Sequence, residues 1–154
     1  MIPKPISAIL DSPVFQLVAR LALLTTFIAP GLMQLVNFNQ TLGEFTFFHL
    51  QPSAAFVVAS IITLLVGSAL VLIGGRWTWL GAGALGIYTG LTIFIVHHFW
   101  TMSGDARLGE MRTFFEHVSL IGGLMVVAQA QNGRRAAALG GSLNTATAAA
   151  PAAE

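Results

Sequence analysis

Residues 54–73 read AAFVVASIITLLVGSALVLI and contain no charged side chain. A helix of about 20 apolar residues is long enough to cross the hydrocarbon core of a bilayer. The run follows Pro52 and Ser53, a helix start signal, and it stops at Gly74, Gly75 and Arg76, which suit a turn. This stretch is therefore predicted to be a transmembrane helix, and it decides the class of fold.

Three other apolar stretches flank this helix, at 14–36, 77–100 and 113–130. The first contains Arg20 near its start, where a long stem can carry the charge to the interface. The stretch 77–100 has Trp77, Trp79 and Trp100 at its two ends, where amphipathic rings favour the headgroup zone. The sequence predicts an all-α, multi-pass integral membrane protein, a four-helix bundle formed by residues 1–133.

The composition agrees with this reading. Of 154 residues, 55% are hydrophobic and 8% are charged, whereas soluble domains carry about 25% charged residues. A soluble globular enzyme is therefore excluded, and a net charge of +1 gives no attraction to nucleic acid. Cysteine is absent, which excludes disulfides, thiolate metal sites and thiol catalysis on this chain. The expected environment is the lipid bilayer.

Basic residues indicate the orientation of the bundle. With four spans both termini share a side, and five of the seven basic residues lie on it, which favours cytoplasmic termini. Arg20 is interpreted as one such topology determinant, with an anionic lipid headgroup or a partner's acid as the alternative. Residues 134–154 are rich in Ala, Gly and Thr and are predicted to form a disordered cytoplasmic tail. The five basic residues are Lys4, Arg20, Arg76, Arg134 and Arg135, against Arg107 and Arg112.

Small residues predict which helix faces meet, since helices in lipid associate by close packing and hydrogen bonds. Following these faces at about 100° per residue, Gln34, His97 and Glu116 are expected to converge toward the bundle axis near the outer surface. The predicted faces are Arg20, Phe27 and Gly31 with Gln34; Ser60, Thr63, Gly67 and Gly74; Gly83, Gly86 and Gly90 with His97; and Glu116, Ser119 and Gly123.

The candidate site lies where these faces end. Ionisable groups within spans are costly and often functional, so His97, Glu116 and His117 are candidate catalytic residues for redox or proton-handling chemistry. An imidazole could hydrogen-bond a quinone carbonyl while a carboxylate exchanges its proton. No motif fixes a metal-ligand spacing, so no metal site is predicted, and structural packing or interface anchoring is the open alternative. The candidate quinone-binding residues are Gln34, His97, His98 and Trp100.

A Phe-rich loop precedes the second span. Glu44 and His49 flank Phe45, Phe47 and Phe48 in this loop. Such a segment could lie on the outer membrane surface as an amphipathic element or cover a substrate site. An interfacial aromatic belt is the favoured interpretation.

The segments IVHHFW at 95–100 and FFEHVSLIGGL at 114–124 carry a family resemblance. Together with Arg20, the Gly31-Leu32 region with Gln34, and the glycine pair before Arg76, they make residues 14–131 resemble the DoxX family of small four-helix bacterial membrane proteins. The resemblance implies residence in the bacterial inner membrane and a link to quinone-dependent redox assemblies.

The chain departs from the family pattern at four positions. Gln34 stands where the family commonly has Lys, and Glu116-His117 stand where it commonly has Lys-Asn. Thr63 lies near a position of the second helix where the family commonly has Glu. A buried Lys/Glu network in the family would therefore be largely replaced here.

Three functional hypotheses follow. The preferred one is a quinone-proximal or accessory subunit of a membrane redox assembly, with quinone as the cofactor class and partner subunits supplying the electrons. The second is a non-catalytic scaffold or anchor whose glycine faces bind a partner's helices or a second copy of the chain. The third is a small haem-binding cytochrome that uses His97 or His98 with His117.

Overall fold

The computed structural model describes residues 3–149, with side chains described up to residue 141, and within this part the chain forms helices without a β-strand. Four segments there are long and apolar enough to cross a membrane, which confirms the all-α membrane class. The helices are α1 (Lys4–Asp11), α2 (Pro13–Val36), α3 (Phe38–Phe47), α4 (Ser53–Ile73), α5 (Thr78–Ile95) and α6 (Gly104–Ala149), with 3-10 turns η1 (Gly75–Trp77) and η2 (Phe99–Thr101).

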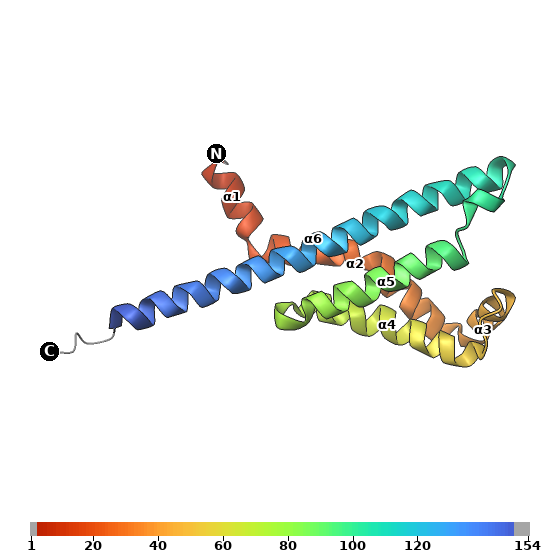
Figure 1. The fold of residues 1–154 in the computed structure, drawn as a ribbon, viewed down its shortest axis with the longest axis horizontal. Helices are drawn as coiled ribbons and strands as arrows, with labels where there is room; N and C mark the ends of the chain where they lie inside the picture. The colour runs from red at the N-terminus through yellow and green to blue at the C-terminus, as the bar shows by residue number, and fades with distance from the viewer. Residues whose placement is uncertain (1–2, 150–154) are drawn as a thin grey trace.

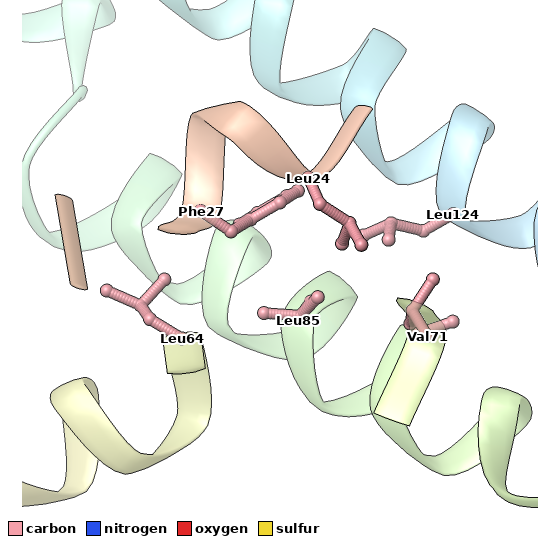
Figure 2. Packing of buried hydrophobic residues seen from close by; sticks show 7 residues of the cluster. Leu24, Phe27, Leu64, Val71, Leu85 and Leu124 are labelled. Carbon is pink, nitrogen blue, oxygen red and sulfur yellow. The ribbon is translucent and has the colours of Figure 1, made fainter. Parts of the chain in front are cut away.

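The bundle is built around α4. Helix α4 packs against α2 on one side and α5 on the other, while α6 packs mainly against α5 (Figure 1). The core is a small cluster at the centre of the four long helices, and Figure 2 shows its side chains pointing toward one another. The labelled members are Leu24 and Phe27 from α2, Leu64 and Val71 from α4, Leu85 from α5 and Leu124 from α6.

Close approach between helices depends on three glycines. A Cβ added at Gly81 would lie 2.6 Å from the carbonyl oxygen of Gly67, and one added at Gly31 would lie 2.8 Å from Leu65. Gly67 itself faces Leu85 at 3.0 Å. Because methyl groups here would collide with neighbouring atoms, these positions let α2, α4 and α5 pack at short range.

The small-residue face predicted for α5 is not the face that packs at close range. Added Cβ atoms at Gly83, Gly86 and Gly90 would meet no atom within 4 Å in the described part of the chain. Helix α5 instead turns Gly81 and Leu85 toward α4. On α4 the prediction is correct at Ser60 and Gly67, which are both buried.

The third span ends as a helix earlier than predicted. Helix α5 stops at Ile95, and the amide of His97 bonds back to the carbonyl of Thr92, five residues earlier, so the regular helical pattern is broken. The aromatic residues Phe99 and Trp100 then form the η2 turn. His97 therefore cannot be placed by extending the helical face of α5.

Helix α6 is longer than the predicted fourth span of 113–130. It begins at Gly104, and Asp105 lies in its first turn, where a carboxylate is favoured by the helix dipole. It continues to Ala149, whereas residues 134–154 were expected to be disordered. Alanine-rich sequence has high helix propensity, and extending a formed helix needs no new nucleation. Residues 150–154 lie outside the described residues.

Arg20 joins three helices at the end of the bundle opposite η2. Its Nη1 donates to the carbonyl of Leu72 in the last turn of α4, at 3.4 Å, and its Nη2 donates to Oε1 of Gln131 on α6, at 2.7 Å. The last carbonyls of a helix lack helical partners and carry partial negative charge. The Gly74 turn, with φ +80, lies directly against the guanidinium. Arg20 is therefore engaged inside the protein.

Candidate functional site

A largely apolar cavity of about 590 Å³ lies between α4 and α5. Its size is typical of a small-molecule site, which commonly encloses 300–1,000 Å³. Helix α4 contributes Phe56 and Ala59, and α5 contributes Ala84 and Leu91. The cavity is thus built on the two most apolar helices of the bundle.

Helix α3 lines one end of this cavity. Phe45 and Phe48 line it, while Phe47 is 77% exposed. Helix α3 lies beside the start of α4, beyond the end of α2 (Figure 1). The Phe-rich segment is therefore a short helix with two of its rings at the cavity and one exposed.

Three polar side chains form a hydrogen-bonded chain in the cavity wall. Ser60 donates to Oε1 of Gln34 at 2.7 Å, and the Ser60 oxygen lies 2.9 Å from the Tyr88 hydroxyl. Because Ser60 has a single proton, Tyr88 donates to Ser60 in this arrangement. Within the described residues, both N–H groups of the Gln34 amide then remain available to a ligand.

Glu44 also lines the cavity. Its carboxylate accepts a hydrogen bond from Gln40 at 3.2 Å, one turn earlier on α3, and its side chain is exposed. Among the described lining residues it is the acidic one. The cavity therefore combines an amide donor, a phenol and a carboxylate on an otherwise apolar surface.

Of the predicted quinone-binding residues, Gln34 lies in the cavity wall and the others lie outside it. His97, in the connection after α5, has its Nδ1 2.7 Å from Oε2 of Glu110 on α6. Its ring lies against that of His117, with centroids 4.7 Å apart. His117 donates through Nδ1 to the carbonyl of Thr113 at 2.8 Å, because a carbonyl oxygen can only accept.

The two rings touch each other directly, which bears on the haem hypothesis. A haem held by His97 together with His117 would need room between the two imidazole rings, and these rings are in contact there, so this pairing does not fit the group. Through its contacts with Glu110 and His117, His97 instead attaches the α5–α6 connection to α6.

The expected convergence of Gln34, His97 and Glu116 is not found. Glu116 is exposed and lines a shallow groove with Thr26 of α2, outside the cavity lining, whereas His97 bonds Glu110. His98 lies near Trp100, with ring centroids 6.4 Å apart, and Trp100 is 49% exposed. The physical reason is that α5 ends before His97 and that α6 turns Leu124 toward the core and Glu116 outward.

Ser60, Tyr88 and Glu44 were not identified as ligand-site residues from the sequence. Tyr88 is the chain's one tyrosine and lies within a largely apolar span, which is a usable signal. Tyrosine hydroxyl groups inside proteins usually have a hydrogen-bond partner. Ser60 was recognised as a packing residue, but nothing in the sequence indicates that it bonds both Gln34 and Tyr88.

Comparisons with known proteins show which family has this architecture. Residues 15–98 match the family model for DoxX. The chain is also similar to the inner membrane protein YphA of Escherichia coli (strain K12), with 31% identity over 117 residues that cover 75% of this chain and 82% of the relative. No solved structure matches the chain significantly. With four apolar spans in one helical bundle, the chain belongs to the DoxX family of membrane proteins.

Proposed function

We propose that the cavity between α4 and α5 binds the ring of a membrane quinone. The observation that carries this proposal is the hydrogen-bonded chain of Gln34, Ser60 and Tyr88 within an apolar cavity. A quinone presents an apolar ring with carbonyl acceptors, and the Gln34 amide offers the matching donors. Few polar groups on an apolar lining are typical of sites that orient such ligands.

Proton exchange is assigned to Glu44. Reduction of a quinone to a quinol takes up two electrons and two protons, and reoxidation releases them. An exposed carboxylate at the cavity can pass protons between the ligand and water. The electrons come from a partner subunit, so the chain acts as an accessory, quinone-proximal subunit. This role replaces the assignment of the carboxylate to Glu116, which lies on another groove.

The orientation proposed for the chain places both termini, the tail included, in the cytoplasm. Arg20 donates a hydrogen bond to Gln131, and Arg134 donates one to Gln16. Arg76 and Arg135 line one cavity together with Gln131, so these four cations gather at the same end of the bundle. Such an excess favours the cytoplasmic side. Glu44 and the α3 end of the cavity then face the periplasm.

A matched pair of alanines on α4 tests the quinone site. Ala59→Phe places a ring in the cavity lining, whereas Ala69, also exposed on α4, lies away from the lining. The full chain, purified in detergent, is titrated by calorimetry with a short-chain benzoquinone and a short-chain naphthoquinone. We expect Ala59→Phe to weaken binding more than tenfold and Ala69→Phe to leave it within twofold. Equal affinity in all three proteins would refute the site.

A specific observation also supports the scaffold role. Gly83 and Gly86 of α5 line a hollow of about 300 Å³ bordered by Met125 of α6, where added Cβ atoms would meet nothing within 4 Å in the described residues. Ile87 and Phe94 on the same helix are 69% and 72% exposed. A partner helix could approach closely along this part of α5. Gly86→Leu is expected to release a partner that co-purifies in mild detergent, without changing quinone affinity. Retention of the partner would argue against this second candidate.

A further inference from the structure

A second cavity, of about 330 Å³, lies at the opposite end of the bundle between the α4–α5 turn and α6. Arg76 from the turn and Arg135 from α6 both line it. Within the described part of the chain, its lining contains no Asp or Glu. Two cations that converge on one hollow without an acid indicate a site for an anion.

The other polar groups of this cavity are also arranged as donors. Gln131 lines it, and its Oε1 already accepts a hydrogen bond from Arg20 at 2.7 Å. The amide oxygen is thereby occupied, and the NH₂ group remains for a ligand. Asn132, the next residue on α6, adds a second amide.

Thr78 supplies an independent observation. This residue lines the cavity from the first turn of α5 and is 1% exposed. Its hydroxyl is fully buried and has no hydrogen-bond partner among the described residues. Buried hydroxyls are nearly always paired in proteins, so an unpaired one in a cavity lined by cations marks a place for a ligand oxygen.

The residues beside this cavity are of the kinds that gather at the lipid headgroups. Trp77 and Trp79 are exposed beside the cavity, and such rings gather where the acyl region meets the headgroups. Arg76 stacks over the Trp77 ring at 4.6 Å. Ile73 and Leu80, on either side of the turn in sequence, are exposed and offer apolar surface to acyl chains.

We infer that this cavity binds the phosphate group of an anionic phospholipid. Arg76 and Arg135 pair with the phosphate, Gln131 and Thr78 donate to its oxygens, and the acyl chains lie along the exposed apolar residues. Basic pockets between transmembrane helices commonly hold such headgroups. Arg20, the headgroup ligand considered from the sequence, is not assigned to this site, because its guanidinium already bonds α4 and Gln131. It is independent of the quinone site.

The test uses the full chain in a zwitterionic detergent and follows its thermal unfolding. Phosphatidylglycerol, phosphatidylcholine and inorganic phosphate are added in separate series. We expect phosphatidylglycerol to raise the Tm and the other two to have little effect. Each neutralised arginine, in Arg76→Gln and Arg135→Gln, should weaken the apparent affinity about fivefold, and the double variant about 25-fold.

Arg112→Gln is the matched control, because Arg112 is exposed on the same helix as Arg135 but near the opposite end of the bundle. It should respond to phosphatidylglycerol like the wild type. The single variant Arg135→Gln, on an exposed stretch of α6, keeps the test available where the double variant fails to fold. Equal stabilisation by inorganic phosphate would overturn the lipid assignment. An unchanged response in the arginine variants would overturn the site.

Discussion

The contrast between two glycines of α5 provides a sharp prediction about the packing of the bundle. In Gly81→Ala the new methyl carbon would lie 2.6 Å from the Gly67 carbonyl oxygen, 2.8 Å from Leu70 and 3.1 Å from Val71. The nearest of these atoms is backbone, which cannot rotate away, so α4 and α5 must move apart. In Gly83→Ala the methyl group meets nothing within 4 Å in the described residues.

The magnitudes follow from this difference. Overpacking of this kind costs about 1–3 kcal/mol, and the backbone collision puts Gly81→Ala at the upper end. Both variants gain up to about 1 kcal/mol of helix propensity. We therefore expect Gly81→Ala to lower the free energy of unfolding by about 2 kcal/mol and Gly83→Ala to leave it unchanged or raised.

Unfolding of the full chain in mixed dodecylmaltoside and sodium dodecyl sulfate micelles, followed by tryptophan fluorescence, measures this difference. The two variants make the same chemical change two residues apart on one helix, so effects of the detergent cancel. The reasoning would be refuted if Gly83→Ala destabilised the protein as much as Gly81→Ala, because the face predicted from the sequence would then be the packed one.

Two other predictions concern the ends of the bundle. Arg20→Gln should lower the free energy of unfolding by about 2 kcal/mol in the same assay, because its bonds to α4 and Gln131 are lost and hydrogen bonds of charged groups contribute about 1.5–3 kcal/mol. Arg112→Gln changes an exposed residue and should alter this free energy by less than about 0.5 kcal/mol. Equal losses in the two variants would contradict the role of Arg20 in joining the helices. Glu110→Gln removes the carboxylate that lies 2.7 Å from Nδ1 of His97. It should leave quinone affinity within twofold, because both residues lie outside the cavity lining. A tenfold loss by calorimetry would return His97 to the ligand site.

The sequence predicts the spans well where apolar runs are long and bounded. Residues 54–73 match α4 almost residue for residue, and the glycine pair after them forms the turn that was expected. The end of the third span was not predictable in this way, since His97 and His98 continue an apolar run without any Gly or Pro to stop it. Hydrogen bonding of His97 to Glu110, on another helix, accompanies that stop.

The site was harder to predict than the spans because helices in lipid are apolar on most sides. A soluble helix shows its buried face through its polar one, but α5 and α6 give only a weak signal of rotation. Gly81 was therefore passed over in favour of Gly83, and Glu116 was turned inward. Gln34 lies in the wall of the proposed quinone cavity, on a face that also carries Phe27 and Gly31, which are both buried.

The position at which a photoreactive azidoquinone cross-links to the full chain tests the proposed quinone site most directly. Labelling is carried out in nanodiscs with and without excess unlabelled quinone, and the modified peptides are identified by mass spectrometry. We expect competed labels on α3 between residues 44 and 48, and on the cavity faces of α4 and α5 around Ala59 and Tyr88. Competed labels at His97, Trp100 or Glu116, with none around Ala59 and Tyr88, would contradict the proposed quinone site.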